Sequence, residues 1–167
     1  ADHEYRLRAN SLTVGAKNPI ITSKKITKRA HSQFAVLNFM IEKLQLGASY
    51  ELIIEIVKDD KVIETDVRKF SALDHSNANP RLVVASCMND AMNTISRKIW
   101  PVVQKQNPDA IFLTGDMVYA YLVKGEFTNR PATKTILWDR YIETRQKVDL
   151  YFQKELKPVY AIWDDHD

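Results

Sequence analysis

The sequence contains one cysteine, Cys87, among its 167 residues, so no disulfide can form within the chain. It contains no run of about 18 apolar residues, the length that a membrane-spanning helix needs. It also lacks internal repeats and low-complexity tracts. These absences exclude a disulfide-stabilised scaffold, a helical membrane span and a repeat architecture.

A large excess of charge of either sign is also missing, because the net charge is only +3 and charged residues make up 27% of the chain. The densest basic stretch, around Lys24 to Arg29, has no aromatic residues between its charges that could stack on bases. We therefore predict no specific nucleic-acid binding. The hydrophobic fraction of 45% is typical of a protein with a packed core.

The front of the chain reads as β-structure. Three runs rich in β-branched and aromatic residues, at 33–39, 50–58 and 61–70, predict strands, and Asp59-Asp60 predicts a hairpin turn between the last two. The stretch 44–50 ends on Tyr50 and resembles the corner of fibronectin-type and immunoglobulin-like sandwiches, where a tyrosine hydroxyl bonds back to the preceding turn. We predict a small all-β sandwich of this kind over residues 1–76.

A polar segment at 74–80 closes with Pro80 and predicts a linker, so we place the domain boundary between residues 76 and 77. Residues 77–167 then alternate between strand and helix. Apolar runs at 81–86, 110–114 and 158–162 predict buried strands. Helices are predicted at 92–106, which Pro101 should kink or end early, and at 138–156. This alternation favours parallel strands with helical crossovers, an α/β domain.

Each of these three strands is followed by residues of types that can bind metals. Cys87 follows the first, Asp116 and Tyr119 follow the second, and Asp164-Asp165-His166-Asp167 follows the third. Ligands gather at the carboxyl ends of parallel strands, so a thiol, a phenol, carboxylates and an imidazole should meet along one edge. We expect a site there.

Each of these residues also has a simpler interpretation. A lone cysteine after an apolar strand is often a small buried hydrophobe, and Gly115-Asp116 is a common turn. The final acidic run would then only solvate the start of a helix. Three carboxylates around one histidine within five residues, however, repel one another unless a cation compensates their charge. Bound metal explains such a cluster more simply.

Three stretches resemble one known family, the alkaline phosphatase D type of the calcineurin-like metallophosphatase superfamily. They are Ala-Ser-Cys at 85–87, Leu-Thr-Gly-Asp at 113–116 with Pro108-Asp109 before it and Tyr119 after it, and Tyr-Ala-Ile-Trp-Asp-Asp-His-Asp at 160–167. The resemblance covers roughly residues 81–167, and its last stretch is the most specific. It implies the N-terminal part of a metallophosphatase α/β domain behind a β-domain.

The resemblance also implies roles for individual residues in a two-metal site. It assigns Cys87 and the phenolate of Tyr119 to the first metal, Asp116 to a bridging position and Asp165 to a metal-binding position. It makes His166 the acid beside the metals, and it leaves Asp164 and Asp167 as residues that support the ligands. It implies hydrolysis of a phosphoester, either a monoester or a diester.

The donor types suggest two unlike metals. Thiolate and phenolate favour a trivalent or soft ion, whereas carboxylates suit hard divalent ions. The resemblance makes Fe(III) the expected first ion, with Ca(II) or another divalent ion beside it. Such a pair acidifies a water and holds the phosphoryl oxygens for in-line attack.

One feature departs from the family pattern, because its remaining metal-binding histidines lie on later strands. The other histidines of this chain, His3, His31 and His75, precede the α/β segment and do not fit those roles. We therefore expect a chain truncated after the Asp-Asp-His-Asp motif and inactive by itself. Relatives of this type are often exported, so we expect a secreted or periplasmic protein. The alternative is a non-catalytic binding or adhesion module built on the β-sandwich.

Overall fold

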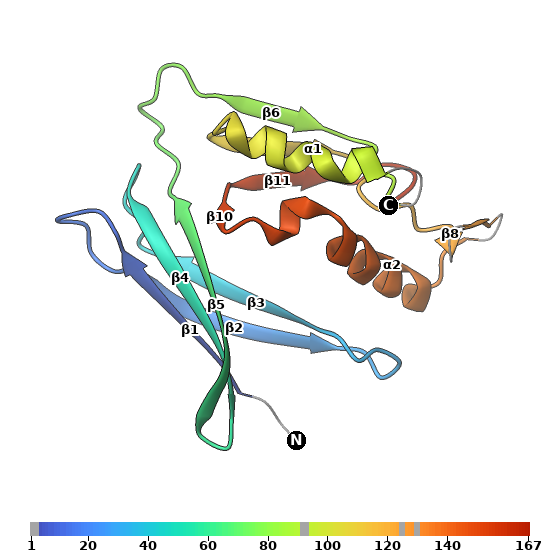
Figure 1. Ribbon diagram of the computed structural model, residues 1–167, viewed down its shortest axis with the longest axis horizontal. Helices are drawn as coiled ribbons and strands as arrows, with labels where there is room; N and C mark the ends of the chain where they lie inside the picture. The colour runs from blue at the N-terminus through green and yellow to red at the C-terminus, as the bar shows by residue number, and fades with distance from the viewer. Residues whose placement is uncertain (1–3, 91–93, 124–125, 129–130) are drawn as a thin grey trace. The chain divides into compact units, whose positions relative to one another are not determined.

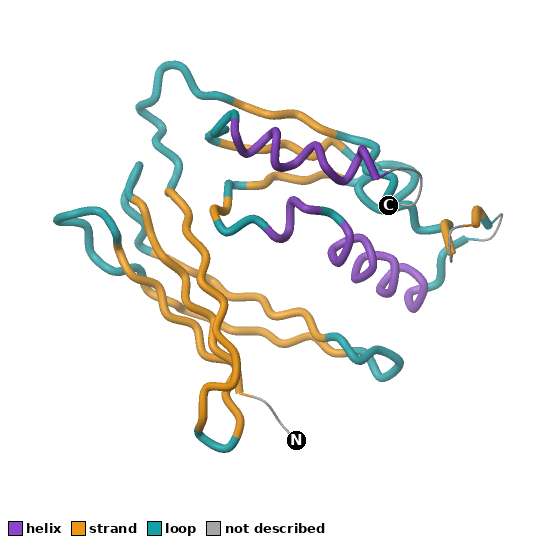
Figure 2. The backbone as a smooth tube through the Cα atoms, viewed as in Figure 1, coloured by secondary structure: helices purple, strands orange, loops and turns teal. Residues whose placement is uncertain are grey.

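The structure, a computed structural model, describes residues 4–90, 94–123, 126–128 and 131–167. The described residues form two compact units. The first comprises the chain up to Lys28, Ala35–Ala78 and Lys154–Lys157, and the second comprises Arg29–Phe34, Asn79–Gln153 and Pro158–Asp167. Strand is the more abundant structure, and the described helices lie in the second unit (Figure 2).

The first unit is built from a four-stranded sheet in the order β1-β4-β5-β10 (Figure 1). These strands are β1 (Glu4–Ser11), β4 (Ser49–Lys58), β5 (Lys61–Ser71) and β10 (Glu155–Leu156). Strand β4 pairs with β1 on one side and with β5 on the other, both antiparallel, and β10 pairs with β5 in parallel. Strands β2 (Ile20–Lys28) and β3 (Ala35–Glu42) form a separate antiparallel pair.

Two local predictions for the first unit are confirmed. Asp59 and Asp60 both adopt left-handed backbone conformations, at φ 50° and 59°, and connect β4 to β5 as a two-residue hairpin turn. The fully buried Tyr50 accepts a hydrogen bond of 2.7 Å at its hydroxyl from the backbone N–H of Gln45, and its ring stacks on Phe70. The tyrosine therefore ties the start of β4 to the turn before it.

The second unit contains a parallel sheet in the order β11-β7-β6, as predicted from the three apolar runs. Its strands are β6 (Leu82–Ala85), β7 (Ala110–Thr114) and β11 (Val159–Ile162). Helix α1 (Thr94–Lys105) follows β6, and helix α2 (Lys134–Lys147) with the 3-10 turn η1 (Asp149–Phe152) precedes β11. Strands β8 (Leu122–Val123) and β9 (Glu126–Phe127) form a short hairpin between β7 and α2.

One face of this parallel sheet packs against a hydrophobic core. The core joins Ile111 and Leu113 of β7 to Trp100 of α1 and to Val148 and Leu150 near η1. Alternate residues on the strands point to the opposite face, where Val84 is 68% exposed and Ile162 is 65% exposed. Among the described residues, this second face therefore remains largely uncovered.

The predicted helix at 138–156 is wrong at both ends. Helix α2 begins at Lys134, after the hydroxyl of Thr133 accepts a hydrogen bond from the Ile136 N–H, and it ends at Lys147. Val148 is extended, with ψ 118°, which directs its buried side chain into the core. Glu155–Leu156 then forms β10 instead of a last helical turn. Tertiary burial overrides the apolar spacing here.

The first predicted helix forms, and one of the two effects predicted for Pro101, an early end, is wrong. Helix α1 continues past Pro101 to Lys105 and does not end early. Its predicted first residues, 92 and 93, lie outside the described residues. Within the described part of the chain, neither helix is long and apolar enough to cross a membrane, in agreement with the predicted lack of a span.

Candidate metal centre

The loops that follow β6, β7 and β11 meet at the carboxyl edge of the parallel sheet. The Cys87 Sγ lies 3.5 Å from the Asp116 Oδ2, within hydrogen-bonding distance for sulfur. The backbone N–H of Met88 donates to the carbonyl of Asp116 at 2.9 Å. The first two predicted ligands are therefore adjacent, and Cys87 is exposed instead of packed as a core residue.

The backbone at both residues is unusual. Cys87 and Asp116 each have a φ of 57°, in the left-handed region that residues with a Cβ rarely adopt. Such conformations cost on the order of 1–3 kcal/mol each and are concentrated at functional sites. In both loops the turn comes immediately after a strand and brings the side chain to the shared edge.

The loop after β11 contributes a carboxylate and an imidazole to the same place. The His166 Nε2 lies 3.9 Å from the Asp116 Oδ2, and the His166 Nδ1 lies 3.8 Å from the Asp165 Oδ2. Each of these three residues offers a ligand atom within 4.8 Å of the other two. An imidazole nitrogen and two carboxylate oxygens at this spacing could hold one cation.

Two tyrosines surround the histidine. The ring of Tyr119 stacks on the imidazole of His166, with centroids 4.8 Å apart. The hydroxyl of Tyr121 lies 2.8 Å from the His166 Nδ1. Desolvation, together with the carboxylates of Asp165 and Asp116, raises the pKa of Tyr121, so this phenol keeps its proton at neutral pH.

Asp167, one of the two predicted supporting residues, holds the loop after β7 in place. Its carboxylate accepts hydrogen bonds of 2.8 Å from the backbone N–H groups of Asp116 and Val118, and one of 3.2 Å from that of Asp164. The carboxylate of Asp164 in turn accepts from the N–H of Asp165 at 2.9 Å. Both residues therefore shape the loops that carry the candidate ligands.

The charge of the site is poorly compensated by protein groups. Among the described residues, the buried Oδ1 of Asp116 has no hydrogen-bond partner. A buried carboxylate oxygen without a partner costs free energy, and a bound cation would remove that cost. The donor set of thiol, phenol, carboxylates and imidazole therefore fits a metal centre.

The ionisation of Tyr119 depends on the same charges. Burial, followed by repulsion from Cys87 and Asp116, raises the pKa of Tyr119 to about 12. Without a cation this residue is therefore a neutral phenol at pH 7. A metal beside it would favour the phenolate by supplying the opposite charge.

The structure brings all seven predicted residues to one edge, listed as Cys87, Asp116, Tyr119, Asp164, Asp165, His166 and Asp167. Sequence reasoning missed Tyr121 and the ion-pair network of Asp90 and Arg140. The sequence did carry one signal for the network: Arg140, Glu143 and Lys147 are spaced so that they lie on one face of a helix. Nothing local indicated that the pair partner would be Asp90.

The chain matches no protein-family model, and the comparison with curated proteins found no match. The functional argument therefore depends on the geometry and chemistry of the residues themselves.

Proposed function

We propose that the chain carries part of the two-metal site of a metal-dependent phosphoester hydrolase, a phosphodiesterase or phosphomonoesterase. One observation supports this most strongly. The side chains that follow three neighbouring strands of the parallel sheet converge on Asp116. The thiol of Cys87 lies 3.5 Å from its carboxylate, and the imidazole of His166 lies 3.9 Å from it. Parallel sheets place their catalytic groups at this edge.

The donor types support unlike metals in the proposed site. Cys87 and Tyr119 would hold the first ion, for which Fe(III) suits a thiolate and a phenolate. Asp116 would bridge to a second ion, Ca(II) or another divalent cation, with Asp165 as a further ligand. When bound, such ions polarise a phosphoryl group and acidify a water.

The protein's own groups would then position the substrate and move protons. In this proposal His166 gives a proton to the departing oxygen of the phosphoester, because its Nε2 faces Asp116 while its Nδ1 is engaged by Tyr121. In this role His166 is an imidazolium, whose Nδ1–H donates to the hydroxyl oxygen of Tyr121 and whose Nε2–H is the transferable proton. Asp167 fixes the backbone on both sides of Met117, and with it the place of the Asp116 carboxylate.

The same proposal extends to the fold. The sheet β11-β7-β6 would be half of a larger α/β catalytic domain, since parallel sheets are normally covered on both faces and one face here exposes Val84 and Ile162. The first unit would be a fibronectin- or immunoglobulin-like domain, an assignment supported by the hydrogen bond between Tyr50 and Gln45.

Metal binding and turnover test the proposal. We expect the purified protein to bind iron with a tyrosinate charge-transfer colour, and we expect hydrolysis of bis-p-nitrophenyl or p-nitrophenyl phosphate only where the remaining metal ligands of the two-metal site are also present. Asp116→Asn should remove bound metal, since it withdraws the bridging charge. Asp60→Asn is the matched control, because Asp60 lies in the β4–β5 turn and asparagine tolerates its left-handed backbone.

Two results would remove the proposal. The first is a metal-free protein whose melting temperature does not change with iron, calcium or chelator. The second is equal metal content in wild type and Asp116→Asn. A binding activity towards a protein or glycan that survives chelation would instead support the alternative of an adhesion module.

A further inference from the structure

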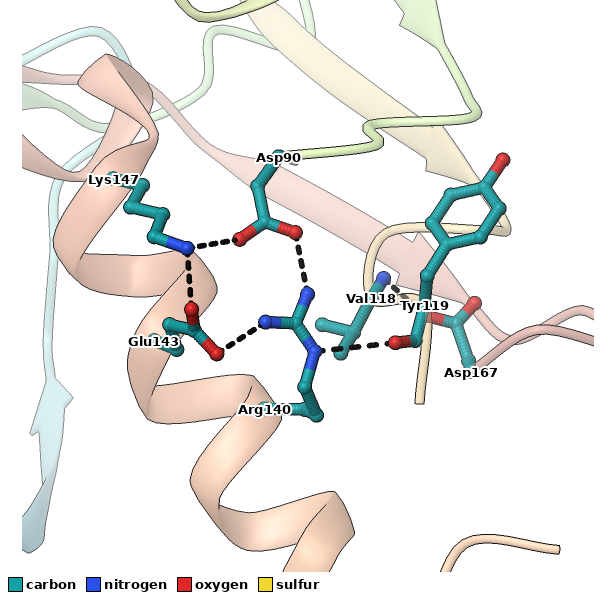
Figure 3. A network of polar contacts seen from close by, with 7 residues as sticks. All are labelled: Asp90, Val118, Tyr119, Arg140, Glu143, Lys147 and Asp167. Atoms are coloured by element: carbon teal, nitrogen blue, oxygen red, sulfur yellow. Dashed lines mark hydrogen bonds and ion pairs between the residues drawn. The ribbon is translucent and has the colours of Figure 1, made fainter. Parts of the chain in front are cut away.

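A buried ion-pair network joins Arg140 of α2 to Asp90 and to the backbone of Tyr119 (Figure 3). Asp90, three residues after Cys87, has a fully buried carboxylate, and the side chain of Arg140 on α2 is 5% exposed. The Asp90 Oδ1 accepts a hydrogen bond from the Arg140 Nη2 at 2.5 Å, and the Lys147 Nζ lies 3.4 Å from the Asp90 Oδ2. An arginine and a carboxylate this deeply buried are each costly without the other.

Each of the three guanidinium nitrogens of Arg140 donates a hydrogen bond to a different partner. Nη2 binds Asp90, Nη1 donates to Glu143 on the same helix, and Nε donates to the backbone carbonyl of Tyr119 at 3.2 Å. Two of these partners belong to the loops that carry the candidate ligands Cys87 and Tyr119 (Figure 3). A single side chain therefore joins both loops to α2.

The network does not supply charge to the metal centre. Arg140 and Lys147 are balanced by Asp90 and Glu143, which they contact directly. The unpaired Oδ1 of Asp116 is not among their contacts. Any influence of Arg140 on the site must therefore come from geometry, through the distance between the two loops.

We propose that Arg140 is a positioning residue that sets the separation of the Cys87 and Tyr119 loops and thereby the metal affinity of the site. The inference rests on the proposed metal-binding function. A lysine at this position keeps the charge, but it cannot place three fixed donors in one plane. The structure uses the planar fork of arginine as well as its charge, which pairs with Asp90.

Iron titration of wild type and Arg140→Lys tests the proposal, with the tyrosinate charge-transfer band as the second readout. We expect iron to bind about 10–100-fold more weakly, the usual effect of losing a group that orients a metal ligand. We also expect a shifted or weakened band, which general destabilisation would not produce. Arg145→Lys is the matched control, since Arg145 lies on the same helix over the ring of Tyr151 and should leave both readouts unchanged.

Amide hydrogen exchange on the metal-free protein separates this inference from the metal proposal. Arg140→Lys should speed exchange in residues 86–90 and 115–119 together, because the Met88 N–H bonded to the Asp116 carbonyl joins those loops. If wild type binds no iron, the metal proposal fails. If wild type binds iron and a folded Arg140→Lys matches it in affinity, band and exchange, the positioning role of Arg140 is overturned.

A second pair of variants covers the case in which Arg140→Lys does not fold. Asp90→Asn keeps an oxygen to accept from the Arg140 Nη2 but removes the charge, so it should weaken iron binding in the same direction. Glu143→Gln changes a contact made within α2 and should leave iron binding near the wild-type value. Equal effects of the two variants would contradict the proposal.

Discussion

Gly115 is the residue whose replacement most directly probes how closely the loops approach. Its φ is +102°, and a Cβ built on it would lie 2.4 Å from the Cβ of Asp164. Gly115→Ala must therefore strain the backbone and displace the loop after β11. We expect it to lower the free energy of unfolding and to reduce metal binding.

Gly15→Ala is the control for the strain of placing a side chain at positive φ, without any steric clash. Gly15 has a φ of +81°, but a Cβ there meets nothing within 4 Å. Chemical denaturation should show a loss for Gly115→Ala that exceeds the loss for Gly15→Ala by about 1–3 kcal/mol, the usual cost of overpacking. Equal losses would mean that Gly115 does not lie against Asp164 in solution.

The raised pKa of Tyr119 predicts that the folding stability of the metal-free protein falls at alkaline pH. Its pKa in the folded, metal-free protein is about 12, raised by burial and by Cys87 and Asp116, whereas an unfolded tyrosine ionises near pH 10. The protonated form is thus favoured by folding. The stability that it contributes is complete below about pH 10 and is lost as the pH rises through 12.

Denaturation of the metal-free protein at pH 9 and pH 11 checks this expectation. The loss of stability between these pH values should be smaller in Tyr119→Phe than in wild type. Tyr160→Phe serves as the control because Tyr160 is half-exposed on β11. An identical loss in all three proteins would place Tyr119 outside the anionic site.

At the scale of elements, the two faces of the parallel sheet differ in how deeply their side chains are buried. Ile111 is fully buried in the core, whereas Val84, beside β7 on β6, is 68% exposed. Ile111→Ala should cost about 2–5 kcal/mol of unfolding free energy. Val84→Ala should cost less than about 0.5 kcal/mol, as exposed substitutions usually do. A large cost at Val84 would show that this face is covered in solution.

Strand positions could be predicted from the sequence because their signals are local. The apolar run at 110–114 coincides with β7, and the hairpin formed around Asp59-Asp60. The end of α2 could not be predicted, because the apolar residues beyond Lys147 follow helical spacing while the core requires an extended Val148. The pairing of β10 with β5 joins residues far apart in sequence, which no local pattern reports.

At the scale of the whole molecule, the convergence of the candidate ligands could be predicted because parallel strands deliver their loops to one edge. The predicted proximity of Cys87 and Asp116 is confirmed at 3.5 Å. The support behind them could not be predicted. Asp90 and Arg140 are 50 residues apart in the chain, and a buried pair at that separation depends on the completed fold.

The central claim is that Cys87 and Asp116 share one bound metal. X-ray absorption of the iron-loaded protein tests it most directly, with Cys87→Ser as the comparison. We predict a sulfur ligand to iron in wild type that disappears in Cys87→Ser while other ligands remain. An iron environment without sulfur in wild type, or one unchanged by Cys87→Ser, would contradict the account.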